Sequence, residues 1–163
     1  MRRAVIVFMG GGIGSCLRAV VLAWLSAWST WLPALLVNLV GSFVIGMVFA
    51  LADEAGLPRA ETRLFVAVGV LGGFTTFSTF GWGAALLAGR GAGALALADV
   101  VASVVGGVAA AGAGLVAGRE VVVALERAAV GLLGWLDERG LRRTGTSRRQ
   151  SEARTREDRQ ESA

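Results

Sequence analysis

The sequence of 163 residues contains no histidine, no lysine, no tyrosine and a single cysteine, Cys16. Without histidine and with only one thiol, the chain lacks the ligands from which most transition-metal sites are built. The same absences remove the Cys–His and Ser–His pairs on which nucleophilic catalysis commonly depends, and no paired acids lie within an apolar segment. Cys16 has no partner for an internal disulfide, and we expect it to be a small buried hydrophobe. An enzyme is therefore the least favoured class of protein.

Charge is also scarce over most of the chain, because ten of the 16 arginines lie at or after Arg119. The formal net charge of +4 therefore does not indicate a nucleic-acid partner. Hydrophobic residues make up 55% of the chain, and the mean hydropathy is +0.64. About 20 apolar residues are enough to span a bilayer, and four segments reach that length: 4–24, 32–52, 64–89 and 91–118. We therefore expect an all-α, multi-pass membrane protein with four transmembrane helices.

The third apolar segment has an unusual middle. A lipid-facing helix would be filled with Leu, Ile and Val, but here glycines precede a cluster of hydroxyl and aromatic side chains. These residues are Gly69, Gly72, Gly73, Thr75, Thr76, Phe77, Ser78, Thr79 and Phe80. Glycine weakens a helix, and hydroxyl groups can bond freed backbone groups. We predict that this helix is broken near its middle, which is tolerated in a membrane only where the backbone is buried in protein or lines a cavity.

Polar residues also occur in the other apolar segments, and each has two interpretations. Arg18 either extends toward the lipid headgroups or faces a water-filled vestibule that attracts anions. Asn38 shares a helical face with Gly41 and Ser42, and it either bonds a neighbouring helix or lines a polar path. Asp99, with Ser103 four residues later, either lies near an interface or touches the transport path.

The sequence changes character after the fourth apolar segment. We predict a transmembrane domain over 1–118 and an amphipathic helix at the membrane interface over 119–139. Residues 140–163 are mostly Arg, Ser, Thr, Gln and Glu without apolar periodicity, so we predict a disordered Arg-rich tail. Anionic membrane lipid could attract its arginines.

Three motifs in this chain resemble those of the Fluc/CrcB family of fluoride channels. They are GGGIGSCLR at Gly10–Arg18, VNLVGSFVIG at Val37–Gly46 and, most specifically, GGFTTFSTF at Gly72–Phe80. The resemblance covers roughly residues 4–118. The chain departs from the family pattern at Gly81, Trp82 and Gly83, where an acidic residue is expected, and it has no tyrosine for the fourth helix.

The resemblance implies a passive channel that exports fluoride from the cytoplasm and relieves fluoride toxicity. It also implies an antiparallel dimer with a structural sodium ion at its centre, held by the backbone carbonyls of Gly72 and Thr75. Phe77 and Phe80 would line the fluoride pore, with Asn38, Ser78, Thr79 and, by approximate alignment, Ser103 as polar groups. Arg18 would be the cation of a vestibule that leads to the pore. An aromatic ring has a positive edge, against which a small anion could rest.

Two other classes of membrane protein are alternatives to a fluoride channel. A small dual-topology multidrug exporter needs a carboxylate within the membrane, and the first apolar segment has none. A non-transporting membrane scaffold would leave the hydroxyl and phenylalanine cluster unexplained.

The distribution of arginine predicts the orientation, because cytoplasmic loops are enriched in basic residues. Five or six arginines on the side of the termini, against one or two on the other, predict cytoplasmic termini in the cell membrane. An antiparallel dimer then requires either a heterodimer with an oppositely oriented homologue or a homodimer of chains that insert both ways.

Overall fold

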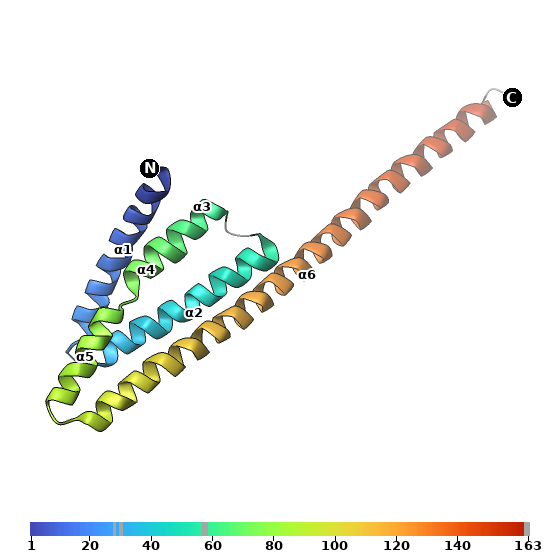
Figure 1. Ribbon diagram of the computed structural model, residues 1–163. Coiled ribbons are helices and arrows are strands. Elements are labelled where there is room, and N and C mark those ends of the chain that lie inside the picture. Colours follow the sequence, from blue (N-terminus) through green and yellow to red (C-terminus); the bar gives the residue numbers. More distant parts are fainter. Residues whose placement is uncertain (28, 30, 57–58, 162–163) are drawn as a thin grey trace. The chain divides into compact units, whose positions relative to one another are not determined.

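The computed structural model describes residues 1–27, 29, 31–56 and 59–161 (Figure 1). Every regular element in these ranges is a helix. The elements are α1 (Arg2–Leu25), α2 (Leu32–Ala55), α3 (Ala60–Arg63), the π-helix η1 (Leu64–Leu71), α4 (Gly72–Phe74), α5 (Phe77–Gly89) and α6 (Gly93–Glu161). Four stretches are long and apolar enough to cross a membrane: Arg2–Leu25, Leu32–Ala55, Ala60–Gly89 and Gly93–Leu136. The predicted all-α fold with four spanning helices is confirmed.

The ends of the helices follow local sequence signals. Pro33 lies in the first turn of α2, where its missing N–H is not needed. Gly56 ends α2 with a φ of 64°, a left-handed conformation that glycine adopts readily. Part of the charged sequence between the second and third apolar segments is helical, because α2 continues to Ala55 and α3 begins at Ala60.

The third spanning helix is broken as predicted. Helical structure ends at Phe74 and resumes at Phe77. Between them, Thr75 (φ −71°, ψ 154°) and Thr76 (φ −147°, ψ 110°) are extended. The π-helix η1, which the short helix α4 separates from the break, was not predicted. Such segments are rare and occur often at functional sites.

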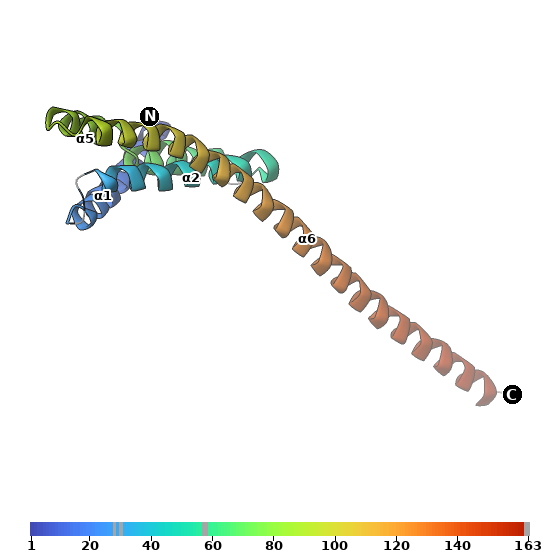
Figure 2. The same ribbon diagram turned by 90° about the horizontal axis from the view of Figure 1, so that it is seen from below.

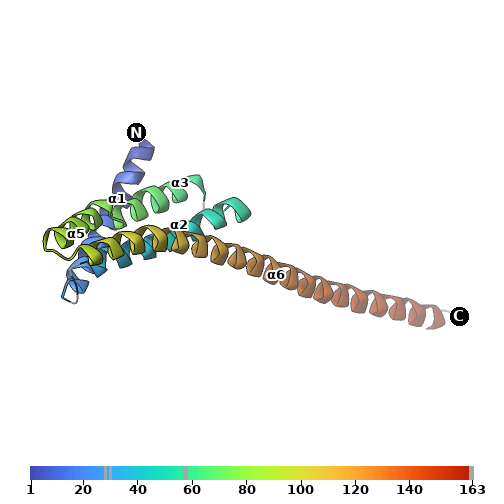
Figure 3. The same cartoon turned by 60° about the horizontal axis from the view of Figure 1, so that its bottom comes forward.

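Glycines bring the helices of the transmembrane unit into close contact. α1 packs against η1 and α4 (Figure 3), and a Cβ on Gly14 would collide with the carbonyl of Val70. The first part of α6 runs beside α2 (Figures 1 and 2), where a Cβ on Gly114 would collide with the carbonyl of Phe43. In the first spanning helix, Gly10 and Gly14 are both close to the backbone of η1. Cys16, by contrast, is exposed in this chain.

The contacts between residues divide the chain into two units, Met1–Val122 and Val123–Ala163. In the second unit the helix continues through Glu161, so residues 140–161, where a disordered tail is expected, have a helical backbone in this structure. The residues from 148 onward are mostly Arg, Glu, Gln and Ala, which favour helix even without an apolar face. Residues 119–139 belong to the same helix rather than to a separate element. Ser162 and Ala163 lie outside the described residues.

Candidate functional site

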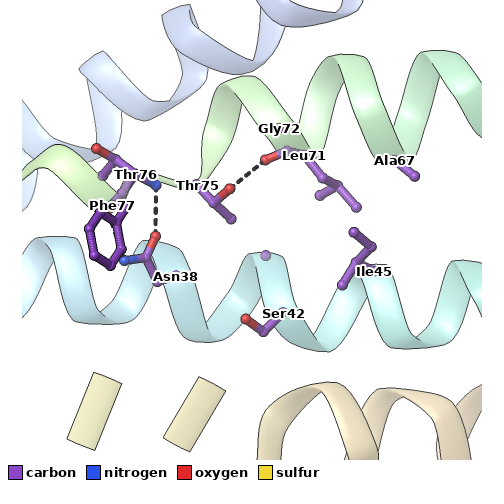
Figure 4. A pocket seen from close by; sticks show the side chains of 10 residues that line it. Asn38, Ser42, Ile45, Ala67, Leu71, Gly72, Thr75, Thr76 and Phe77 are labelled. Atoms are coloured by element: carbon purple, nitrogen blue, oxygen red, sulfur yellow. Dashed lines mark hydrogen bonds between the residues drawn. The ribbon is translucent and has the colours of Figure 1, made fainter. Parts of the chain in front are cut away.

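A cavity of about 330 Å³ lies between α2 and the broken third helix (Figure 4). Four of the predicted site residues line it, namely Asn38, Gly72, Thr75 and Phe77. The other lining residues are Gly41, Ser42, Ile45, Ala67, Leu71 and Thr76. Gly41 is required by the fold, because a Cβ there would collide with the methyl group of Thr75. The break is therefore pressed against α2 at a position where α2 has no side chain.

Asn38 joins α2 to the break through two hydrogen bonds with one residue. Its Oδ1 accepts the backbone N–H of Thr76 at 2.8 Å, and its Nδ2 donates to the carbonyl of Thr76 at 3.0 Å. Figure 4 shows the Asn38 side chain directed at Thr76. The amide replaces the partner that an unbroken helix would give the Thr76 N–H, and it adds a bond to the Thr76 carbonyl. Of the two interpretations of Asn38, the bond to a neighbouring helix is confirmed, and its place in the lining leaves the polar path open as well.

Thr76 lies in the predicted cluster of hydroxyl and aromatic side chains, but no role in the site was predicted for it. Its hydroxyl accepts the N–H of Thr79 at 3.2 Å and donates to the Thr79 hydroxyl at 3.0 Å, so it is the N-cap of α5. The Ser78 hydroxyl is 3.4 Å away. Threonine three residues before a bonded N–H is a recognised capping pattern, and that spacing could have identified Thr76. The same pattern explains why Ser78 and Thr79 follow the break.

Arg18 reaches the break from α1. Its Nη1 donates to the backbone carbonyl of Thr75 at 3.1 Å, and the Ser15 hydroxyl lies 3.5 Å from the carbonyl of Gly73. The guanidinium is therefore directed at the broken helix and not at the headgroup region. Charged groups within a membrane are costly unless they are paired or bonded, and a freed carbonyl is a suitable partner for this cation.

Phe77 and Phe80 form an edge-to-face pair at the start of α5. Their ring centroids are 5.5 Å apart, with an angle of 63° between the ring planes. The two rings have different surroundings, because Phe77 is 83% exposed in this chain and Phe80 only 9%. In an edge-to-face pair the positive edge of one ring meets the negative face of the other. Phe77 therefore presents most of its surface to whatever lies beside this chain.

Ser103 is not brought to the cavity. It lies on α6, and its hydroxyl is 3.5 Å from a carboxylate oxygen of Asp99, which is buried. Phe80, Ser78, Thr79 and Arg18 also fall outside the cavity lining, although all four lie close to the break in sequence or through a hydrogen bond. The predicted residues thus gather around the break, with Ser103 as the exception.

The chain belongs to the CrcB-like family. The family model described as "CrcB-like protein, Camphor Resistance (CrcB)" matches residues 5–115. A relative from Sphingopyxis alaskensis is 44% identical over 113 residues, which are 68% of this chain and 90% of that protein. A relative from Agrobacterium fabrum is 43% identical over 121 residues, covering 70% and 94% of the two chains. Both are named "Fluoride-specific ion channel FluC". Residues after 115, including the second unit, lie outside the family match.

Proposed function

We propose that this chain is a subunit of a passive, fluoride-selective channel, which lets fluoride leave the cytoplasm and relieves its toxicity. The observation that carries the proposal is the helix break at Thr75–Thr76, braced by Asn38 and followed directly by the Phe77–Phe80 pair. This combination is a polar, irregular backbone next to aromatic edges in a membrane helix. Such a feature is not expected in a helix that faces only lipid, because irregular backbone is tolerated in a membrane only where it is buried in protein or lines a cavity.

The chemistry of the site suits a small anion that has lost its water. Asn38 has two amide hydrogens, and only one is donated to a described acceptor, the Thr76 carbonyl. The second is available to an anion in the cavity that Asn38 lines. Hydroxyl donors follow at Ser78 and Thr79, and the exposed ring of Phe77 offers a positive edge. These groups can replace part of a hydration shell without adding a fixed charge.

Efflux from liposomes tests the proposal. Purified protein in liposomes loaded with fluoride should release fluoride without an energy source, while liposomes loaded with chloride retain their contents. Protein-free liposomes give the background. If the protein-dependent release is the same for both anions, or is absent for fluoride, the proposed selectivity is refuted.

The resemblance also implies a structural sodium ion, and the backbone at the break fits one. In an unbroken helix the Gly72 carbonyl would accept the Thr76 N–H, which here is bonded to Asn38. The Thr75 carbonyl would accept the Thr79 N–H, which here is bonded to the Thr76 hydroxyl, and it receives Arg18 instead. Carbonyl oxygens are ligands that hard cations accept. One chain offers two of them, so we propose that an antiparallel partner supplies two more to the same ion.

A central cation should stabilise the assembled protein. We expect a higher thermal unfolding midpoint in sodium than in a bulky organic cation. The ion gives the Gly72 carbonyl a partner and gives the Thr75 carbonyl, which is already bonded to Arg18, a second one in a dry interior. Thr75→Val is the matched control, since it keeps the backbone carbonyl and should keep the sodium dependence. Equal midpoints in the two cations would contradict the site.

The orientation of the chain is the remaining part of the proposal. The ion pairs Arg2–Glu61 (2.8 Å) and Arg119–Glu54 (3.3 Å) lie at the end of the helices where most arginines of the transmembrane unit are found. On that side are Arg2, Arg3, Arg59, Arg63 and Arg119, with Arg127 close behind, against Arg90 and at most Arg18 on the other. Such a bias favours one orientation, with cytoplasmic termini. We therefore propose a heterodimer with an oppositely oriented homologue.

Cysteine labelling at both termini in intact cells tests this orientation. We expect almost no labelling by a membrane-impermeant reagent until the cells are permeabilised. Cys16→Ser provides the background without the native thiol. Substantial labelling from outside, together with fluoride flux from this chain alone, would favour a homodimer of chains that insert both ways.

A further inference from the structure

A second cavity, of about 500 Å³, lies where α1 and the third spanning helix begin. Charged side chains line one part of it, and apolar side chains line the rest. The charged residues are Arg3, Glu61 and Arg63, and the apolar ones include Phe49, Ala67 and Val68. Arg63 and Ala67 are separated by about one helical turn, so the wall contributed by this helix changes from basic to apolar along its length. Phe49 of α2 adds to the apolar part.

The charges in this cavity do not cancel. The Glu61 carboxylate is paired with Arg2 at 2.8 Å, and both side chains are more than half exposed. Within the described ranges, neither Arg3 nor Arg63 has a carboxylate within ion-pair distance. The cavity therefore holds two guanidinium groups that are not paired with a carboxylate, beside the Glu61 carboxylate that Arg2 neutralises. A guanidinium binds phosphate through two parallel hydrogen bonds, which makes arginine well suited to a phosphate group.

The position along the membrane selects the kind of anion. Two spanning segments, Arg2–Leu25 and Ala60–Gly89, begin beside the cavity, so its arginines lie at the level of the lipid headgroups. Its apolar wall then lies at the level of the acyl chains. The side chains there are open to contact with lipid, because Val68 is 54% exposed and Phe49 is 43% exposed. Basic pockets between transmembrane helices are typical sites for anionic headgroups.

We propose that this cavity binds one anionic phospholipid. Arg3 and Arg63 hold its phosphate, and an acyl chain lies against Phe49, Ala67 and Val68. Neither step depends on fluoride conduction, so this proposal can fail while the proposed function holds, and the reverse is also true. The site requires only the membrane position of the helices.

Native mass spectrometry of the full-length protein tests the proposal, with phosphatidylglycerol and phosphatidylcholine as the probes. We expect the wild type to retain phosphatidylglycerol in preference to phosphatidylcholine. The double variant Arg3→Gln/Arg63→Gln should bind phosphatidylglycerol about tenfold or more weakly, since it loses charge-assisted bonds. Arg59→Gln is the matched control, because Arg59 is exposed at the same end of the helices but does not line the cavity. It should bind the lipid as the wild type does.

Three outcomes would overturn the site. One is equal retention of the two lipids by the wild type. Another is a loss in Arg59→Gln as large as in the double variant, since that indicates attraction to the whole basic surface. The third is displacement of the lipid by inorganic phosphate at equal concentration, which shows that the apolar wall contributes nothing. Arg3→Lys/Arg63→Lys keeps the charge without the planar fork. Partial retention by this variant shows that a loss in the glutamine variant is not a failure to fold.

Discussion

Replacing Phe77 or Phe80 by isoleucine is expected to abolish or strongly reduce fluoride efflux while leaving the assembled protein intact. Isoleucine is apolar and similar in hydrophobicity, so burial and membrane insertion change little. It lacks the positive ring edge that can face an anion. The centroids of the two rings lie 5.5 Å apart in an edge-to-face arrangement. Removing either ring therefore also removes the contact that orients the other ring.

Phe8→Ile is the matched control for this experiment. Phe8 is 82% exposed on α1, almost as much as Phe77 at 83%, and it does not line the cavity at the break. Flux through Phe8→Ile should remain close to that of the wild type, and size-exclusion profiles of all three variants should match. Wild-type flux in both Phe77→Ile and Phe80→Ile would remove these residues from the proposed pore.

The architecture of the transmembrane unit was predictable because its signals are local. An apolar run of about 20 residues predicts a spanning helix by length alone. The glycines and hydroxyls around Gly72 and Thr75 predict a break, because each weakens helix at its own position. The N-cap at Thr76 is also a local signal, because it depends only on the spacing between Thr76 and Thr79.

The contacts that complete the site were not predictable in the same way. The bond from Arg18 to the Thr75 carbonyl joins residues 57 positions apart, and the two bonds from Asn38 to Thr76 span 38 positions. Such pairs depend on how α1 and α2 pack against the third helix, which no periodicity in one segment determines. For this reason neither interpretation of Arg18, an extension toward the headgroups or a place in a vestibule, predicts its bond to a carbonyl at the break.

The helix beyond residue 140 shows a different limit of sequence reasoning. The absence of apolar periodicity indicates that a segment has no core to bury, and disorder was expected from it. Helix formation depends instead on backbone propensity, which is favourable for Arg, Glu, Gln and Ala. The composition of this segment therefore did not predict the helical backbone that the structure shows there.

Asn38→Ala is expected to have the second large effect, on stability as well as on flux. Asn38 satisfies both the N–H and the carbonyl of Thr76, which is 5% exposed. Truncation leaves the buried Thr76 N–H without its partner, which costs about 1–3 kcal/mol. It also removes one bond to the Thr76 carbonyl, which as the N-cap carbonyl still accepts the first bond of α5. The extended conformation of Thr75 and Thr76 then loses its main support from α2. We expect a lower unfolding midpoint and loss of fluoride efflux.

Two variants separate this role from simpler explanations. Leu36→Ala truncates an apolar side chain that is larger than that of Asn38, on the same helix, at a position that is 37% exposed. It should leave fluoride efflux unchanged. Thr76→Val removes the hydroxyl that caps α5 but keeps the backbone groups that Asn38 binds, so its unfolding midpoint should lie between those of Asn38→Ala and the wild type. If Asn38→Ala lowered flux without lowering the midpoint, Asn38 would act on the ion alone and not as a brace. If both flux and midpoint were unchanged, the two hydrogen bonds to Thr76 would not support the break, and the helix packing at Gly41 and Gly14 would have to hold it in place.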